Sequence, residues 1–260
     1  MTSARFLLCD ADGNLFPSEA PAFEASAGVT NRLLGSLGIE ARYTAEELRE
    51  MGIGRTFRTN VVALAEEHGK TIAAGELEDW VAAENAAVTD HLARVLHPDR
   101  AVIEPLERLS RVFELAAVSS SALTRLQACF RAAALEELFP AERTFSAEDS
   151  LPAPRSKPAP DVYLHALFEL GARPDDAVAV EDSVAGVTSA RAAGIRTVGN
   201  VVFVPEPDRA AHGASLVAAG AELVIDGWPA LEAELVRYAR RPRPELPRSQ
   251  AESSCSMLRR

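Results

Sequence analysis

The stretch Phe6-Leu7-Leu8-Cys9-Asp10-Ala11-Asp12-Gly13-Asn14 guides the interpretation of the rest of the chain. Its four apolar residues stop abruptly at a polar segment that contains glycine, a pattern typical of a buried strand that runs into a loop. The loop carries two carboxylates, Asp10 and Asp12, directly after the strand. We therefore expect a buried first strand that presents acidic side chains where it ends.

Farther along the chain, from residue 101 onward, apolar segments alternate between helical and extended patterns. Helices are predicted at 102–109, 122–138, 160–170 and 184–193, and strands at 113–118, 143–146, 177–180, 196–202 and 223–225. Strands separated by helices of this length indicate a parallel sheet with right-handed crossovers. The sequence thus predicts an α/β fold with a doubly wound parallel sheet.

A helical block interrupts this series after the first strand. Thr44 and Glu47 have the spacing of a capping box, and an apolar stripe ends at Gly69. A further helix is predicted from about residue 76, with Leu77 and Val95 on its apolar face. We predict a core formed by 1–18 and 97–238, with an α-helical cap domain, 19–96, inserted into it.

Composition limits the possible partners and location. The formal net charge of −11 argues against binding to nucleic acid or to an anionic membrane. No apolar run approaches the ~18 residues of a membrane span. Cys9, Cys129 and Cys255 fit neither a disulfide framework nor a zinc site. We expect a cytoplasmic protein whose last residues, 241–260, form a disordered tail rich in Arg, Pro and Ser.

Polar residues follow the predicted strands at separate places in the sequence. They are Asp10 and Asp12, Ser119, Lys157, and the pair Glu181 and Asp182. In a doubly wound sheet, ligands bind in the crevice beyond the carboxyl ends of the strands. We therefore expect these side chains to converge on one crevice.

Their chemistry suits phosphoryl transfer. One of two neighbouring carboxylates can attack phosphorus while the other moves a proton to the leaving group and from water. Magnesium neutralises the charge through hard oxygen ligands, for which Asp182 and Glu181 add carboxylates. Lys157, one of only two lysines, suits a transferring phosphoryl group. Taken singly, each has an ordinary alternative, such as an acidic turn, a helix N-cap at Ser119 or a solvated loop lysine.

Four segments in order resemble the haloacid-dehalogenase-type phosphatase superfamily, over about residues 5–226. The segments are Asp10-Ala11-Asp12-Gly13-Asn14-Leu15, Val118-Ser119-Ser120-Ser121, Lys157-Pro158-Ala159-Pro160-Asp161-Val162-Tyr163 and Val180-Glu181-Asp182-Ser183-Val184-Ala185-Gly186. The third has the form used by sugar-phosphate phosphatases. The helical block resembles the caps that close over such sites and choose the substrate.

The resemblance implies a role for each site residue. Asp10 is expected to be the nucleophile and a Mg²⁺ ligand, and Asp12 the general acid/base with its backbone carbonyl on the metal. Asp182 and Glu181 are expected at the same metal ion. The residues expected to hold the phosphoryl group are Gly13, Asn14, Ser119, Ser120 and Lys157.

Further residues narrow the expected reaction. Asp12 argues against dehalogenation, because family dehalogenases lack this second aspartate. Ala22 stands where the mutase branch carries a histidine, which favours hydrolysis, although a phosphomutase of the β-phosphoglucomutase type remains an alternative. Asn14 replaces a common threonine, which is the only support for a non-catalytic binding protein on this fold. The expected substrate is a small phosphorylated metabolite, such as a sugar or sugar-acid phosphate.

Candidate substrate contacts in the cap are less specific. Arg55 has the planar fork that binds a carboxylate or second phosphate, and Glu19 belongs to a Ser-Glu pair that resembles hexose-phosphate phosphatases. Arg58 and His68 are weaker candidates, and His68 fits a helix terminus better. The sequence leaves the identity of the metabolite and the oligomeric state open.

Overall fold

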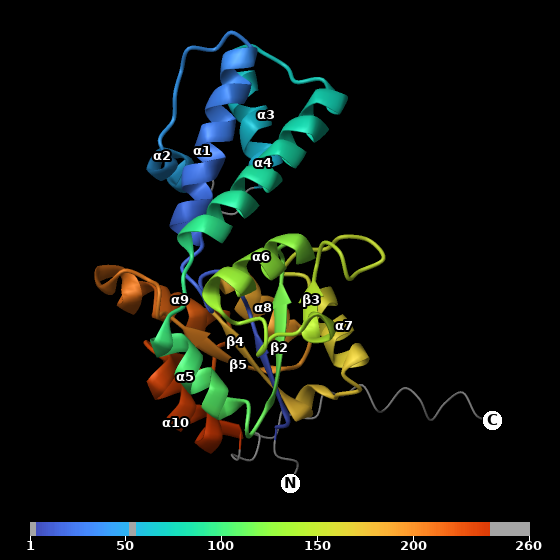
Figure 1. Cartoon of the computed structure of the whole chain (residues 1–260), viewed down its shortest axis with the longest axis vertical. Coiled ribbons are helices and arrows are strands. Elements are labelled where there is room, and N and C mark those ends of the chain that lie inside the picture. Colours follow the sequence, from blue (N-terminus) through green and yellow to red (C-terminus); the bar gives the residue numbers. More distant parts are fainter. Residues whose placement is uncertain (1–3, 52–55, 240–260) are drawn as a thin grey trace, which may run out of the picture.

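A six-stranded parallel sheet forms the centre of the molecule (Figure 1). The computed structural model describes residues 4–51 and 56–239. The strands lie in the order β3-β2-β1-β4-β5-β6. Their bounds are β1 Phe6–Cys9, β2 Glu114–Ser119, β3 Thr144–Ser146, β4 Ala177–Glu181, β5 Arg196–Asn200 and β6 Leu223–Ile225. The α/β fold with a doubly wound parallel sheet is confirmed.

The strand order reverses at β1. The chain first builds β2 and β3 on one side of β1, then returns to build β4, β5 and β6 on the other. Cys9 lies in register with Val180 of β4 and with Ala117 of β2. The residues that follow β1 and β4 therefore emerge side by side at the topological switch point, where ligands of such sheets bind.

Alternate residues of β1 pack on opposite faces of the sheet. Leu7 and Cys9 belong to one apolar cluster, and Phe6 and Leu8 to another. The first cluster includes α5 (Arg100–Leu109), α6 (Leu123–Ala133) and α10 (Trp228–Ala239). The second includes α7 (Asp161–Glu169) and α8 (Val184–Ala192). Burial of both faces explains why β1 reads as a continuous apolar run.

Between β1 and β2 the chain forms a helical insertion of α1 (Glu19–Ser36), α2 (Ala45–Met51), α3 (Phe57–Glu67) and α4 (Ala74–Val95). Figure 1 shows it beyond the edge of the sheet toward which the arrow of β2 points. Leu33, Leu48 and Leu64 contribute to an apolar cluster within the insertion. The predicted capping box is present, since Thr44 N–H donates to Glu47 Oε2 and Glu47 N–H donates to Thr44 Oγ1. Its function as a cap domain stays a prediction.

Several elements differ from the sequence-based expectations. Helix α6 is only eleven residues long and ends at Ala133, because Ala134 adopts a left-handed conformation with φ of 54°. Helix α9 (Arg209–Ala219) and helix α10 were not expected. Val95 is 40 % exposed, so it does not share the buried face of α4. Short 3₁₀ helices, Ala141–Arg143, Pro174–Asp176 and Glu206–Asp208, precede β3, β4 and α9.

Two further expectations concern location. Among the described residues, no helix is both long enough and apolar enough to cross a membrane. Cys9 and Cys129 are buried free thiols, and burial raises the pKa of Cys129 to about 12. Cys9 is a buried small side chain, as expected, but Cys255 and the predicted tail lie outside the described residues.

Candidate active site

Asp10 and Asp12 are two residues apart but have different partners. The Asp10 side chain is buried, and its Oδ1 lies 2.5 Å from Lys157 Nζ. Asp12 instead accepts hydrogen bonds from two hydroxyls, Ser18 Oγ at 2.6 Å and Ser121 Oγ at 2.8 Å. One carboxylate is thus held by a cation and the other by neutral donors, an arrangement that allows two different chemical roles.

Lys157 joins three strand ends. Its ammonium group donates to Asp10 Oδ1, to Glu181 Oε1 at 2.6 Å and to the carbonyl of Val118 at 2.8 Å. These bonds use all three ammonium hydrogens. Burial alone would lower the pKa of Lys157, but Asp10 and Glu181 outweigh it and raise that pKa. Lys157 is therefore a fixed positive charge at the carboxyl edge of the sheet.

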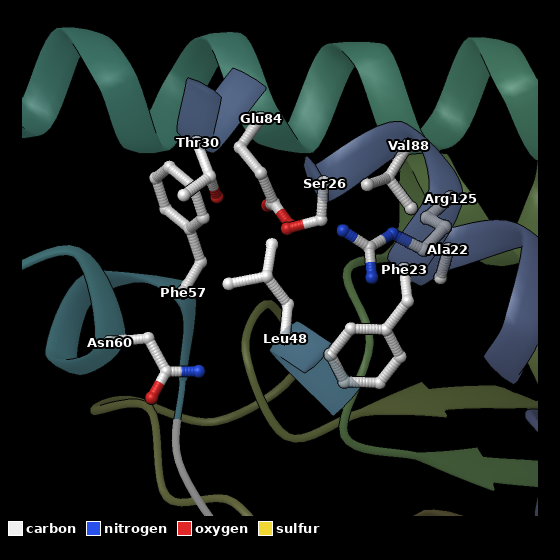
Figure 2. Close-up of a pocket in the computed structure, with 10 residues that line it drawn as sticks. All are labelled: Ala22, Phe23, Ser26, Thr30, Leu48, Phe57, Asn60, Glu84, Val88 and Arg125. Atoms are coloured by element: carbon white, nitrogen blue, oxygen red, sulfur yellow. The ribbon is translucent and has the colours of Figure 1, made fainter. Parts of the chain in front are cut away.

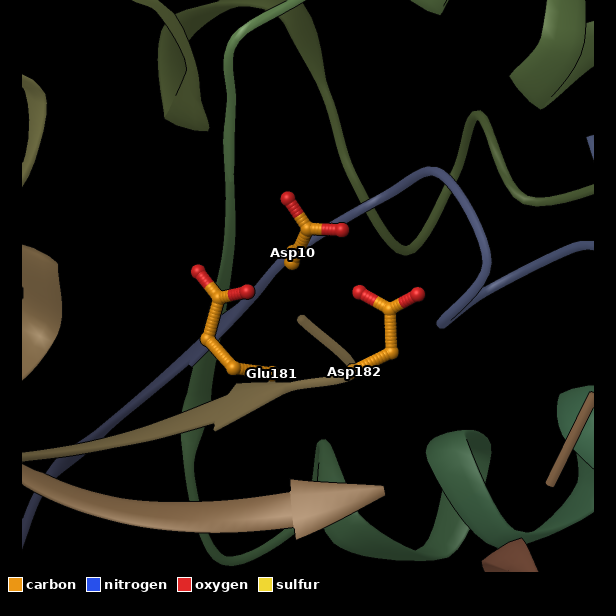
Figure 3. A group of neighbouring side chains, drawn as sticks. All are labelled: Asp10, Glu181 and Asp182. Atoms are coloured by element: carbon orange, nitrogen blue, oxygen red, sulfur yellow. The ribbon is translucent and has the colours of Figure 1, made fainter. Parts of the chain in front are cut away.

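Three carboxylates gather around the switch point (Figure 3). Oxygens of Asp10, Glu181 and Asp182 lie within 4.8 Å of one another. Burial raises the pKa of Asp10 to about 8, with repulsion by Glu181 and Asp12 adding to the effect and Lys157 opposing it. Burial and the same kind of repulsion raise the pKa of Asp182 well above its usual range. A divalent cation would relieve this repulsion and favour the ionised forms.

Glu181 and Asp182 differ in what their carboxylates can still bind. Glu181 is fully buried, and its Oε1 accepts hydrogen bonds from both Lys157 and Tyr163 Oη. Its Oε2 has no hydrogen-bond partner among the described residues and lies where a Cβ on Gly186 would fall, at 1.8 Å. Glu181 is thus enclosed by protein and fixes the lysine.

Asp182 faces the turn that follows β1. A Cβ built on Gly13, whose φ is +71°, would lie 2.1 Å from Asp182 Oδ2. His212 Nε2 donates to the backbone carbonyl of Asp182 and anchors this residue from α9. The missing side chain at Gly13 therefore leaves space for the Asp182 carboxylate opposite Asp10. Carboxylate oxygens in this arrangement fit a hard cation such as Mg²⁺.

Ser119 and Ser120 lie beside Lys157 and Asp12. Ser119 is buried, and its Oγ accepts a hydrogen bond from the backbone N–H of Ser121 at 3.0 Å. Ser120 Oγ accepts from the backbone N–H of Lys157 at 3.3 Å. The structure thus brings together residues from β1, β2, the loop before α7 and β4, as the sequence predicted.

Two of the residues expected to contact a phosphate, Asn14 and Gly13, make hydrogen bonds within the protein. The Asn14 side chain is fully buried, and its amide donates to the carbonyls of Asp10 at 2.8 Å and Val180 at 3.3 Å. Its Oδ1 accepts from Asn200 Nδ2, so its polar atoms are all used inside the protein. The N–H of Gly13 donates to the carbonyl of Phe16 within the turn. Both groups are engaged within the protein, and their expected contact with a phosphate stays a prediction.

Among the described residues, the expected cap contacts lie on the surface of the helical insertion. Arg55 lies outside the described residues, and Glu19 is exposed at the first position of α1. Arg58 makes a two-fold ion pair with Glu78 at 2.5 and 2.6 Å on the surface. His68 follows the last residue of α3, as expected for a residue at a helix terminus.

Sequence reasoning missed several side chains that support the site. Tyr163, His212 and Asn200 hold Glu181, Asp182 and Asn14, respectively. Tyr163 stood within a quoted motif, but nothing in the pattern indicated its partner. The other two lie in segments where no polar signal distinguished them from surface residues.

Comparisons with known proteins agree with this geometry. The family model described as haloacid dehalogenase-like hydrolase matches residues 6–194. A conserved haloacid dehalogenase-like protein of unknown function from Agrobacterium tumefaciens is 30% identical, with a TM-score of 0.67 over 91% of this chain and 99% of that one. A hydrolase of this family from Deinococcus radiodurans, with bound phosphate and sodium, is 29% identical, with a TM-score of 0.65 over 91% and 97%.

A third solved structure is CbbY from Rhodobacter sphaeroides in complex with phosphate. It is 25% identical and has a TM-score of 0.67 over 89% of this chain and 96% of that one. No curated protein matches the chain. The family match covers the strands and loops that carry Asp10, Lys157 and Asp182. The chain belongs to the haloacid dehalogenase-like hydrolase family.

Proposed function

We propose that this hydrolase is a Mg²⁺-dependent phosphatase that removes the phosphoryl group of a small phosphorylated metabolite through an aspartyl-phosphate on Asp10. The observation that carries the proposal is the buried bridge from Lys157 to Asp10 and Glu181, with Asp12 held separately by two serine hydroxyls. A nucleophile beside a fixed cation and an independent acid/base are the two parts that phosphoryl transfer to a carboxylate requires.

In the first step, a carboxylate oxygen of Asp10 attacks phosphorus and the bond from phosphorus to the leaving oxygen breaks. Asp12 gives its proton to that oxygen, so the product leaves as an alcohol. Lys157 compensates the charge of the phosphoryl oxygens, and the hydroxyl of Ser119 can donate to one of them. In the second step, water attacks phosphorus and Asp12 takes its proton. The bond between phosphorus and Asp10 then breaks, which releases phosphate and restores the carboxylate.

Asp10 and Asp182, with the backbone carbonyl of Asp12, would hold the Mg²⁺ ion. The ion supplies charge neutralisation for a phosphorylated anion that approaches a carboxylate. Glu181 is assigned a positioning role, because its Oε1 already binds Lys157 and Tyr163. Space for the Asp182 carboxylate beside Gly13 supports this set of ligands.

The relatives support the reaction class. The Deinococcus radiodurans and Rhodobacter sphaeroides proteins were both solved with phosphate bound. Since those relatives bind phosphate, we propose that the substrate of this protein is a phosphorylated metabolite. A cytoplasmic location stays a prediction, with which the free thiols Cys9 and Cys129 agree.

The two alternatives have little support from the geometry. Ala22 lies one helical turn after Ser18, so the start of α1 offers no imidazole near Asp12 for a mutase. The non-catalytic alternative depended on Asn14, whose side chain is part of a buried hydrogen-bond network.

Phosphate release from p-nitrophenyl phosphate, measured with and without Mg²⁺, tests the proposal. Turnover should require Mg²⁺ and fall at least about 10³-fold in Asp10→Asn, which keeps the shape and removes the nucleophile. Asp79→Asn, the same change at an exposed position of α4, should leave turnover intact. Unchanged turnover in Asp10→Asn would overturn the mechanism.

A further inference from the structure

A cavity of about 120 Å³ lies between helices α1, α2, α3, α4 and α6 (Figure 2). We call it the insertion pocket. Its apolar walls include Phe23, Leu48, Phe57 and Val88. Apolar pockets with a few convergent polar groups are the usual form of small-molecule sites. The polar groups of this pocket and its position indicate which class of ligand it can bind.

Two of the helices that line the pocket, α1 and α6, follow residues that hold Asp12. Ser18, which donates to Asp12 Oδ1, accepts a backbone hydrogen bond from Ala22, the first residue of the α1 wall. Ser121, which donates to Asp12 Oδ2, precedes Arg125 of the α6 wall by four residues. Each of these serines is thus four residues from a residue that lines the pocket, which brings the pocket near Asp12 along two chain segments. Because the proton of Asp12 must reach the leaving oxygen, the leaving group must lie near the residues that hold Asp12 and precede these two helices.

Two opposite charges face each other inside the pocket. Figure 2 shows the Glu84 carboxylate and the Arg125 guanidinium pointing into the same space, close to Ser26. Burial raises the pKa of Glu84, while Ser26 and Arg125 act against that rise. Arg125 Nη2 donates to Asn85 at 2.9 Å, but its buried Nε has no hydrogen-bond partner among the described residues. A buried donor without a partner points to a ligand atom that would complete it.

We propose that the insertion pocket binds the leaving group of the phosphomonoester and that Glu84 and Arg125 select an uncharged polyhydroxy alcohol, the leaving group of a polyol or sugar monophosphate. This inference rests on the proposed function. Hydroxyls can accept from the Arg125 guanidinium and donate to Glu84, and the carbon skeleton can pack on Phe23 and Phe57. A carboxylate or a second phosphate would instead meet the Glu84 carboxylate in a poorly solvated space.

The test compares substrates with the same three-carbon skeleton. Glycerol 3-phosphate ends in a hydroxymethyl group and 3-phosphoglycerate in a carboxylate. The preference is the kcat/KM for glycerol 3-phosphate divided by the kcat/KM for 3-phosphoglycerate. This ratio does not depend on the fraction of active enzyme. The intact chain should prefer glycerol 3-phosphate by about tenfold or more, since a buried charged partner discriminates at this level. A preference for 3-phosphoglycerate would overturn the inference.

Charge-neutral variants test the two residues. Glu84→Gln should reduce the preference about tenfold, because it removes repulsion of the carboxylate, whereas Arg125→Gln should increase it. Glu66→Gln, the same change at an exposed position of α3, is the matched control and should leave the ratio unaltered. An unchanged ratio in Glu84→Gln would overturn the assignment.

Failure of this inference can be told apart from failure of the proposed function. If the protein hydrolyses p-nitrophenyl phosphate in a Mg²⁺- and Asp10-dependent manner but shows neither the expected preference nor its shift, only the assignment of the pocket fails. If none of the three phosphates is hydrolysed, the proposed function fails and this inference fails with it.

Discussion

At the scale of single residues, the site depends on how neighbouring carboxylates are distinguished. Asp10 is paired with a buried ammonium, whereas Asp12 is held by serine hydroxyls. Glu181 and Asp182 are also neighbours, yet one is enclosed by Lys157 and Tyr163 and the other faces Gly13. The partners, more than the residue types, support the proposed division into nucleophile, acid/base, positioning group and metal ligand.

Gly13→Ala tests the space reserved for Asp182. The new methyl group would fall 2.1 Å from Asp182 Oδ2, so this carboxylate must move. We expect kcat/KM to fall at least about 10²-fold and the Mg²⁺ concentration for half-maximal rate to rise, because displacement of about 1 Å is enough for such a loss. Initial rates over a Mg²⁺ titration measure both effects.

Gly38→Ala is the matched control. Its φ of +74° imposes the same left-handed strain, but a Cβ there would meet nothing within 4 Å. Each variant should lose about 1–2 kcal/mol of stability, and only Gly13→Ala should lose Mg²⁺ response. Equal Mg²⁺ titrations in the two variants would contradict the role given to Gly13.

At the scale of elements, Asn14 ties the turn after β1 to three other parts of the core. Its amide donates to a carbonyl of β4, and its Oδ1 accepts from Asn200 of β5. Its backbone carbonyl accepts from Trp228 Nε1 of α10 at 3.1 Å. These contacts join segments as far as 214 residues apart in sequence and hold the loop that carries Asp10 and Asp12.

Asn14→Ala tests this network. The change leaves the Asn200 amide and two backbone carbonyls without their buried partner, so we expect the free energy of unfolding to fall by about 1–3 kcal/mol. Urea unfolding followed by circular dichroism measures the loss. Gln127→Ala, at an exposed position of α6, should change stability by less than about 0.5 kcal/mol. A loss no larger than in that control would contradict the network.

The same network shows which features could be predicted from sequence. The apolar run before Asp10 and the polar strand ends predicted the sheet and the convergence of Lys157 with Asp10, because parallel strands share one carboxyl edge. Asn14 was expected at the phosphate from its place in a motif. A motif does not show where a side chain points, so the buried partners of Asn14 could not be predicted from it. Its partners, Val180 and Asn200, come from distant strands, so no local pattern could identify them.

Helices α9 and α10 were missed for a related reason. The segment 209–219 is rich in alanine, and only Gly213 and Leu216 are buried in it, so its apolar stripe is short. Trp228, Leu231 and Leu235 of α10 do have helical spacing, and their burial against the sheet became visible only with the fold. Local periodicity predicts the helices and strands that have strong apolar patterns. Tertiary packing decides whether segments with weak patterns form helices.

At the scale of the whole molecule, the fold concentrates negative charge at one edge of the sheet. The chain carries a net charge of −11, and three carboxylates lie within 4.8 Å of one another at the switch point. The helical insertion lies beyond the edge of the core toward which β2 points (Figure 1). Repulsion among these carboxylates links the stability of the fold to pH and to cations.

Stability should therefore fall with rising pH when divalent cations are chelated. The pKa of Asp10 is about 8 in the fold, against an ordinary value of 3.8, so the folded state holds a proton that the unfolded state has lost. The stabilising contribution is complete below the ordinary pKa and disappears as pH rises through the folded pKa, at up to about 1.4 kcal/mol per pH unit.

Urea unfolding in EDTA between about pH 5 and about pH 8 measures this slope. Asp10→Asn cannot ionise and should show a shallower decline than the intact protein. Saturating Mg²⁺ should stabilise the intact protein most at the upper end of this range, where Asp10 is ionised. Equal slopes in the two proteins would contradict the raised pKa of Asp10.

The central claim is that Asp10 carries the phosphoryl group during turnover. The most direct measurement is acid quenching of the Asp12→Asn variant during reaction with p-nitrophenyl phosphate, followed by mass spectrometry of its peptides. The nitrophenolate leaves without a proton, whereas attack by water lacks its base, so the intermediate should accumulate. The account predicts one added phosphoryl group on the peptide that contains Asp10. Turnover with no phosphoryl group on that peptide at any time would contradict it.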